Sequence, residues 1–234
     1  MNNIDYGRGQ VEWALWRSFT PFKPVSKEIP KVFLTRIKRL LEIDRKTNLD
    51  DAEERPGVDY AFAAPASEDT GEIAYTHLDA FCLAIALDLL DIGFKQSEVV
   101  FLMYYLRPDL EDLLPTLLNG PSLTDRQRHR AQDNPGYPSY EYRGMDEADG
   151  RVFVIIKKME IKEVSQGLRN WNSKIPLFLE PVYCHGIHEL ADTFRDLTPY
   201  KRRALTVVEL ASMAQSVAIN LEAAPEIRRG RPRS

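Results

Sequence analysis

The residues of this chain best suited to binding a ligand are basic and lie within the first fifth of the sequence. From Ser26 to Ile43, apolar residues recur at helical spacing, and cationic side chains occupy the other positions. The cations are Lys31, Arg36, Lys38, Arg39 and Arg45. Such side chains attract the phosphates of a nucleic acid, and their spread over more than one helix face favours backbone contacts over base reading. A solvated helix face that binds nothing is the alternative.

A second basic cluster ends the sequence. It reads Arg228-Arg229-Gly230-Arg231-Pro232-Arg233-Ser234. Its core, residues 229–232, resembles the AT-hook, a motif that binds the minor groove of A·T-rich DNA. The resemblance implies that the glycine lets the backbone approach the groove floor, that the arginines lie along the groove in its negative potential, and that the proline keeps the strand extended. A disordered basic tail without preference for A·T tracts is the alternative.

A third group has the residue types of a metal site. Cys184, His185 and His188 lie close together, with Glu189 beside them. A structural zinc needs four ligands, and no second cluster of such residues occurs in the sequence. The group is therefore expected to hold no metal. The other cysteine is Cys82, so no disulfide framework is expected and a reducing compartment fits best.

Sequence motifs for catalysis are absent. The sequence contains no nucleophile elbow, phosphate-binding loop, dinucleotide fingerprint or zincin signature. We therefore expect a protein that is not an enzyme and needs no cofactor, although catalytic residues need not be close together in a sequence.

Charge is distributed unevenly along the sequence. The net charge is −4, yet residues 1–46 carry 10 basic and 5 acidic side chains, and residues 47–125 carry 3 basic and 16 acidic ones. Residues 151–234 are again basic, with 14 basic and 9 acidic side chains. The acidic total thus leaves nucleic acid open as a partner of the two basic ends. No signal peptide or membrane span is expected, which favours a cytoplasmic protein.

Helical periodicity dominates the first half. It predicts helices over residues 8–19, 29–43, 76–92, 97–106 and 109–118. In the clearest of them, Thr76 is expected to cap the first turn with Asp79 as its partner, and Gly93 supplies the left-handed residue that ends it. Pro108 is expected to separate the last two. The last three helices should pack as one unit.

The segment from Gly71 to Met103 resembles the second half of the winged helix-turn-helix domain of the MerR family. The matching positions are Tyr75, Gly93, Phe94, Glu98 and Val99. The resemblance implies a tyrosine that closes the wing and a Gly-Phe turn between two helices. Two features depart from the family: residues 34–37 only loosely match its reading helix, and prolines interrupt the region where it has one long dimerising helix. A generic helical hairpin fits the segment as well.

The second half changes character. Residues 119–150 are rich in proline, glycine and charge, which predicts a flexible linker. Residues 151–156 and 175–179 predict two strands, and residues 186–197 predict a helix. Thr198-Pro199 is expected to start a long last helix that ends at Pro225.

Together these patterns predict an α+β protein, mostly α. The expected parts are an N-terminal helical domain that can be winged-helix-like (1–118), a linker (119–150), a small α+β domain (151–225) and a basic tail (226–234). The expected function is that of a regulatory protein that binds double-stranded DNA, cytoplasmic or nucleoid-associated, with a homodimer formed by the last helix. The alternative is a protein-interaction module without DNA affinity that uses its acidic helices and Trp13/Trp16.

Overall fold

The computed structural model of the chain describes residues 5–21, 28–47, 58–65, 73–120, 150–159, 177–196 and 205–225. These residues form a mostly helical protein with one small three-stranded antiparallel sheet, which confirms the predicted α+β, mostly α class. The sequence predicted two of the three strands. The chain divides into two compact units, one of residues 1–114 with 216–234 and one of residues 115–215. Among the described residues, no helix is both long and apolar enough to cross a membrane.

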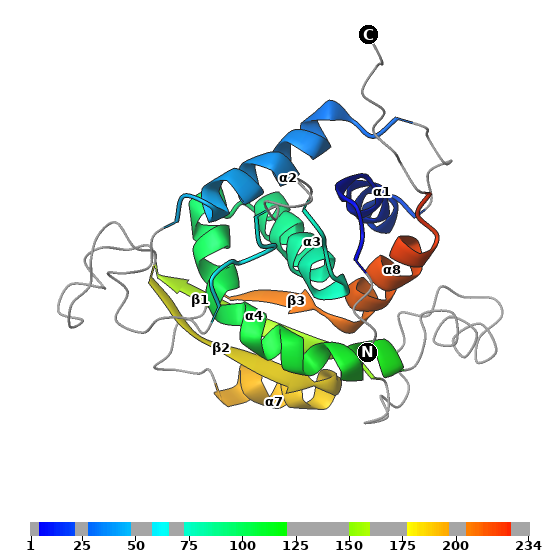
Figure 1. Ribbon diagram of the computed structural model, residues 1–234. Coiled ribbons are helices and arrows are strands. Elements are labelled where there is room, and N and C mark those ends of the chain that lie inside the picture. Colours follow the sequence, from blue (N-terminus) through cyan, green and yellow to red (C-terminus); the bar gives the residue numbers. More distant parts are fainter. Residues whose placement is uncertain are drawn as a thin grey trace, which may run out of the picture. The chain divides into compact units, whose positions relative to one another are not determined.

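The helices of the first unit pack around α3 (Figure 1). Helix α3 (His77–Asp91) is apolar on nearly every side, and its residues 78–87 are all buried. A helix without a polar face must lie in the interior. Helices α1 (Arg8–Phe19) and α2 (Lys31–Asp44) pack against it and against each other. Tyr6 pairs with Tyr75 in an antiparallel bridge just before α3 begins.

Both ends of α3 follow the sequence prediction. The Thr76 hydroxyl accepts a hydrogen bond from the Asp79 amide at 3.2 Å, and the Asp79 carboxylate accepts one from the Thr76 amide at 2.8 Å. This reciprocal pair satisfies two amides that the first helical turn leaves without partners. At the other end, Gly93 adopts a φ of +102°, a conformation that side-chain-bearing residues rarely adopt.

Helix α4 corrects one prediction. A single helix runs from Gln96 to Asn119, where the sequence predicted two helices divided at Pro108. A proline inside a helix removes one backbone hydrogen bond and bends the axis, and Figure 1 shows α4 bending part-way along. The helix continues because its apolar face is uninterrupted and buried. That face consists of Leu106, Leu110, Leu114 and Leu117.

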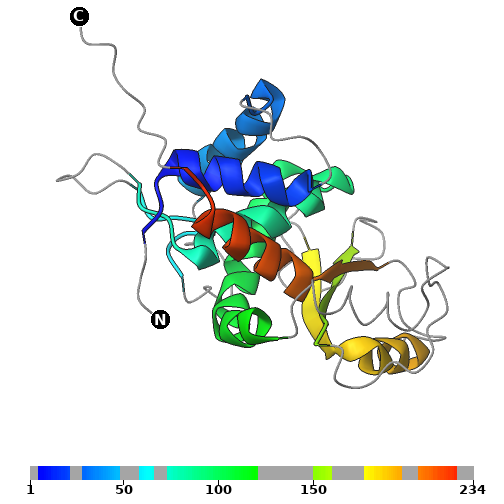
Figure 2. The ribbon, with the colours of Figure 1, turned by 90° about the vertical axis from the view of Figure 1, so that its right-hand side faces the viewer.

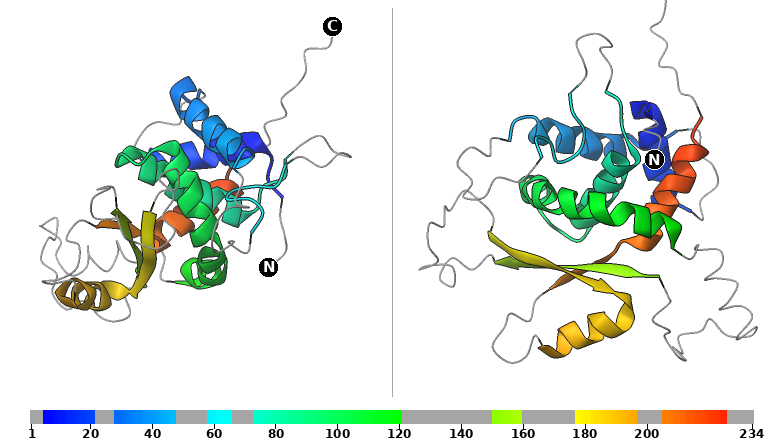
Figure 3. Two further views of the ribbon diagram at one scale, coloured as in Figure 1. Left: turned by 90° about the vertical axis from the view of Figure 1, so that its left-hand side faces the viewer. Right: turned by 60° about the horizontal axis from the view of Figure 1, so that its bottom comes forward.

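The sheet belongs to the second unit and has the order β2-β1-β3. The strands are β1 (Val152–Met159), β2 (Leu177–His185) and β3 (Thr206–Glu209), with β2 longer than predicted. Helix α7 (Gly186–Asp196) follows β2 directly and covers one face of the sheet (Figure 3). Phe153 and Ile155 of β1 meet Leu190 of α7 there, together with Cys184.

Strand β3 corrects a second prediction. The sequence predicted one long helix over residues 198–225, whereas α8 spans only Ala211–Glu222 and is preceded by a strand. Val208 pairs with Val154 of β1, and Val207 pairs with Ile155. Consecutive β-branched residues suit such a position, but their spacing from the later apolar residues also fits a helix. Periodicity alone could not separate the two.

The predicted linker lies almost entirely outside the described residues, as does the tail. Helix α8 begins in the second unit and ends in the first. In the first unit its last turns lie beside α1 (Figure 2), where the Asn220 side-chain amide donates a hydrogen bond of 3.1 Å to the Ser18 hydroxyl.

Candidate nucleic-acid interface

Helix α2 presents one buried side and one basic side. Ile37, Leu40 and Leu41 are buried against the rest of the first unit. The remaining arc is exposed and includes all the cations of this helix and the residues directly after it. We call it the α2 basic face: Lys31, Arg36, Lys38, Arg39, Arg45 and Lys46. The five positions predicted from the sequence thus lie at the surface, four on α2 and Arg45 directly after its end.

Aromatic contacts hold the first turns of α2. The Phe33 ring lies edge-on to Trp16, with centroids 5.2 Å apart, and near Phe19 at 6.1 Å. Trp16 is half-buried by this packing, as is Trp13 on the same helix. The Trp16 ring therefore serves the α1–α2 contact, which leaves less of it for an outside partner.

A buried carboxylate holds the other end of α2. Asp44 is 2% exposed and accepts hydrogen bonds from the amides of Ala61 at 2.9 Å and Phe62 at 3.2 Å. Burial raises the pKa of Asp44, although these two amides and Arg107 act in the opposite direction. Nothing in the sequence pattern indicated this contact, because a charged residue among basic ones is typical of a solvated face.

Arg107 of α4 completes this anchor. Its guanidinium donates hydrogen bonds to the carbonyls of Ala61 and Phe62 and, at 2.6 Å, to the Asp79 carboxylate. Tyr104, one turn earlier, donates its hydroxyl to the Asp44 carbonyl at 3.2 Å. Residues 58–65 are thereby clamped between the end of α2 and α4. Helix α2 is accordingly a fixed platform within the first unit.

The charges of the α2 basic face are largely available to an outside anion. Lys38 lies 3.5 Å from Glu42, the one exposed acid of the helix, and Arg36 lies 3.9 Å from Asp91 of α3. Both pairs are solvent-exposed, and such pairs contribute about 0–1 kcal/mol. No acid of the described residues lies within 4 Å of the other four cations.

Helical geometry divides these cations into stripes. Lys31, Lys38 and Arg45 are separated by seven residues each, so they form one stripe that drifts by about 20° per heptad and rises by about 21 Å in all. Arg39 lies about 100° around the helix from Lys38, and Lys46 lies in the turn that follows α2. Arg36 lies about 140° around the helix from Lys31, at the border with α3.

The surface around α3 and α4 is acidic. Asp91, Asp109, Glu111 and Asp112 are exposed, which disfavours α4 as a DNA-reading helix, as the sequence indicated. Glu98 is different, because it is 8% exposed and its carboxylate accepts a hydrogen bond from the Lys95 amide at 2.9 Å. It caps the first turn of α4.

The second predicted contact, residues 228–233, lies outside the described residues. The residues that lead into it, up to Pro225, are described. Helix α8 ends at Glu222, and its Asn220 bonds Ser18 of α1, which packs against α2. Residues 216–225, which lead into the tail, and the α2 basic face therefore belong to the same compact unit, although about 180 residues separate Arg45 from Pro225 in the sequence.

The Cys184 group is distributed between β2 and α7. Cys184 is buried, with its sulfur 3.4 Å from the Thr193 hydroxyl, whereas His185 and His188 are exposed. Glu189 accepts a hydrogen bond from the His185 amide at 2.5 Å. In the part of the chain that the structure describes, no three residues of the metal-ligating types are gathered as a metal site would require.

The positions behind the MerR-like resemblance occur in a helix–turn–helix arrangement. Tyr75 precedes α3 in the bridge with Tyr6, and Gly93 turns the chain into α4. Phe94 is half-buried at the turn and Val99 is buried. Helix α4 contains two of the prolines that depart from the family pattern, Pro108 and Pro115, and ends at Asn119. Membership of that family remains a prediction, because a generic helical hairpin has the same features.

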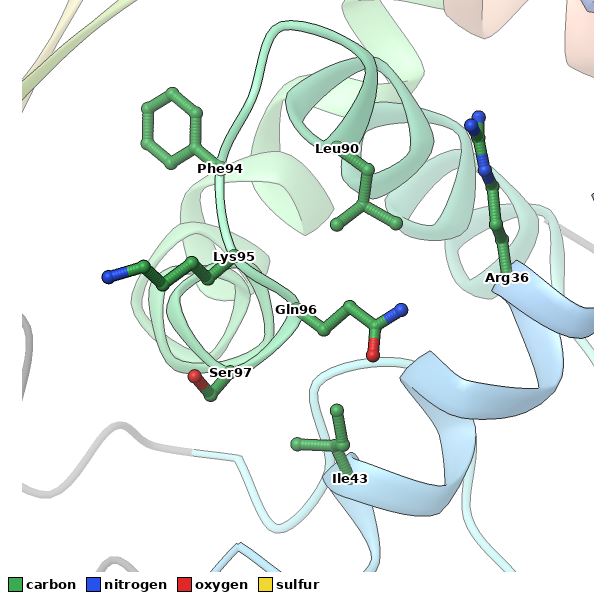
Figure 4. A pocket seen from close by; sticks show the side chains of 7 residues that line it. All are labelled: Arg36, Ile43, Leu90, Phe94, Lys95, Gln96 and Ser97. Atoms are coloured by element: carbon green, nitrogen blue, oxygen red, sulfur yellow. The ribbon is translucent and has the colours of Figure 1, made fainter.

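A groove runs between α2 and the turn from α3 to α4. Its volume is about 530 Å³, and Figure 4 shows the side chains around it. Leu90, Gln96 and Ile43 point towards its middle, and Arg36 borders it on α2. No pattern in the sequence predicts this groove, since its walls are brought together from three separate elements.

Comparisons with known protein families, with characterised proteins and with solved structures find no match to this chain.

Proposed function

We propose that this chain is a regulatory protein that binds double-stranded DNA through the α2 basic face and its C-terminal tail. The observation that carries the proposal is the surface of α2, where six exposed cations accompany a single exposed acid. Phosphate contacts of this kind supply most of the sequence-independent affinity for DNA.

The arrangement of the cations favours an extended polyanion over a small anion. The stripe of Lys31, Lys38 and Arg45 spans about 21 Å, far longer than one phosphate group. Arg39 lies beside this stripe on the same helix, and Lys46 follows the end of the helix. Successive phosphates of a duplex offer matching rows of negative charge, and the fixed anchors at both ends of α2 reduce the ordering needed on binding.

The tail would supply a second contact, with a preference for A·T tracts. The residues that lead into the tail belong to the same unit as α2. If α2 and the tail bind the same duplex, the second contact is therefore intramolecular. A weak minor-groove contact then raises the total affinity tenfold or more.

The test is the salt dependence of binding to a fluorescein-labelled duplex of mixed sequence, measured by anisotropy between 50 and 300 mM KCl. The triple variant Lys31→Gln, Lys38→Gln, Arg45→Gln should bind more weakly to every duplex. Its log–log salt slope should be shallower by about 0.9 for each phosphate that the variant no longer neutralises, and so by up to about 2.7.

The matched control is Arg195→Gln on α7, which removes one cation that is 79% exposed in the second unit. It should leave the slope unchanged, whereas each single variant of the stripe should reduce it. No binding of the wild-type protein at 50 mM KCl would refute the proposal and favour a protein-interaction module. Weaker binding to one sequence alone would make α2 a base reader.

The tail is tested separately by Gly230→Leu, which keeps every charge and blocks backbone approach to the groove floor. On matched duplexes, this variant should show no preference for A·T over G·C, unlike the wild type. Equal affinity of both proteins for both duplexes would leave only a basic tail without groove recognition.

A further inference from the structure

The groove beside α2 has the size and composition of a binding site for a protein segment. It is bordered by α2, by the end of α3 and by the first turn of α4, and its volume is about 530 Å³ (Figure 4). Leu90 and Ile43 supply an apolar floor, and the Gln96 amide projects between them. The groove is open along one side, so it cannot enclose a small molecule as deeply as ligand pockets do.

Exposed apolar side chains lie next to this groove. Val32 is 69% exposed and precedes Arg36 by one helical turn, and Ile92 is 57% exposed and directly follows Asp91. In the described part of the first unit, Ile219 is the one other large apolar side chain with comparable exposure. Two of these three residues are therefore neighbours, in the chain, of residues that line the groove. Exposed apolar residues grouped in this way mark interaction sites more often than an isolated one does.

The charge of the lining is positive. Arg36 and Lys95 border the groove, and no acidic residue lines it. Each lining cation has one acid beside it: Lys95 lies 3.7 Å from Glu98, and Arg36 lies 3.9 Å from Asp91. Asp91 is 78% exposed, and at that distance and exposure its pair with Arg36 contributes little. A carboxylate of a partner can therefore replace Asp91 at the guanidinium, and would form a more strongly held pair beside an apolar contact that excludes water.

The α2 side of the groove suits a short helix. Its two lining residues on α2, Arg36 and Ile43, lie about 10.5 Å apart along the helix, and Val32 extends the same side of α2 by one further turn, to about 16 Å or three turns. A helix laid in such a groove uses apolar residues at positions i, i+3 or i+4, and i+7. We propose that this groove binds an acidic amphipathic helix of a protein partner, with its apolar side chains on Leu90, Ile43 and Val32 and a carboxylate on Arg36.

The experiment uses the full chain and a designed probe. The probe is an 18-residue fluorescein-labelled peptide with leucines at positions i, i+3, i+4 and i+7 and glutamates flanking them. Its twin has lysine in place of each glutamate. Binding is measured by anisotropy at 150 mM salt. The acidic peptide should bind at least tenfold more tightly than its basic twin.

Two variants on one helix provide a matched pair. Arg36→Glu should lower the affinity for the acidic peptide at least tenfold and raise the affinity for the basic twin, because it reverses the charge at the groove. Arg39→Glu makes the same change of net charge on α2, but Arg39 does not line the groove. It should reduce acidic-peptide binding less than threefold.

The fold of both variants is checked by circular dichroism, and Val32→Ser, at an exposed position, gives a third measurement of the groove. It should weaken the acidic peptide, whereas Ile219→Ser should not. Equal binding of the two peptides, equal effects of the two arginine variants, or no binding of the acidic peptide at 100 µM would overturn the proposal. None of these results depends on DNA binding, so the two proposals fail separately.

Discussion

Replacing Arg107 by methionine is expected to lower the free energy of unfolding by about 3 kcal/mol. The Arg107 side chain is 16% exposed and its partner Asp79 is 6% exposed, so the pair is largely removed from water. Methionine retains an unbranched stem but donates no hydrogen bond. The carbonyls of Ala61 and Phe62 lose their donor in the same step.

The magnitude follows from these contacts. Removing one partner of a buried ion pair destabilises a protein by about 3–5 kcal/mol, and each carbonyl left without a donor adds about 1 kcal/mol. Two features reduce the sum. Asp79 keeps the hydrogen bond of its capping box with Thr76, and the partly exposed arginine site admits water to the carbonyls. A value near the lower limit of the range is therefore expected.

Urea unfolding of four proteins measures the effect: the wild type, Arg107→Met, Asp79→Asn and the double variant. The coupling energy from this cycle should be about 2 kcal/mol, because each single change removes the same ion pair. Arg195→Met is the control, since its pair with Asp192 is exposed on both sides and should contribute less than about 0.5 kcal/mol. Single effects of Arg107 and Asp79 that add within about 0.5 kcal/mol would refute the clamp as an ion-paired unit.

Other perturbations give equally definite outcomes. At pH 7.5, Asp88→Asn should raise Tm by about 2–4 °C, which corresponds to about 1 kcal/mol. At pH 4 it should leave Tm unchanged. Calorimetry measures both values. Burial, and then Asp91, raises the pKa of Asp88 to about 6, so the folded state binds its proton more tightly and stability falls as pH rises from about 4 to 6. Gly93→Ala should lower the free energy of unfolding, measured in urea, by about 1–2 kcal/mol because φ at this position is +102°. Burial raises the pKa of Cys82 to about 12, so iodoacetamide at pH 8 should modify it only after unfolding, as peptide mass spectrometry will show.

Local signals in the sequence predicted much of the fold. Helix α1, helix α3 with its capping box, and the turn at Gly93 each depend on residues a few positions apart, and they match the structure closely. The errors arose where a local rule met a larger packing requirement. Because proline disfavours helix interiors, the sequence predicted two helices on either side of Pro108. The buried leucine face from Leu106 to Leu117 instead keeps α4 continuous. Residues 206–209 became a strand because β1 offered an edge to pair with.

The candidate interface divides in the same way. The exposed cations of α2 follow from its amphipathic pattern, so sequence reasoning identified nearly all of them. The anchors do not follow from it, because Asp44 and Arg107 are charged residues whose burial depends on partners 17 to 60 positions away. The groove likewise requires α2 to lie against a turn some 50 residues later.

Arg36 belongs both to the α2 basic face and to the border of the groove, and this links the two proposals. A carboxylate and a phosphate cannot occupy one guanidinium together. The stripe of Lys31, Lys38 and Arg45, however, lies about 140° or more around the helix and stays free when the groove is filled. A bound acidic helix should therefore remove one phosphate contact and leave the others, which reduces DNA affinity by about tenfold or less instead of abolishing it. Linkage requires DNA to weaken the acidic helix by the same factor. Peptide titrations with and without a saturating duplex measure that factor, and Arg36→Gln should bring it close to one. A factor that stays the same in Arg36→Gln would mean that the two ligands interact through another part of the surface.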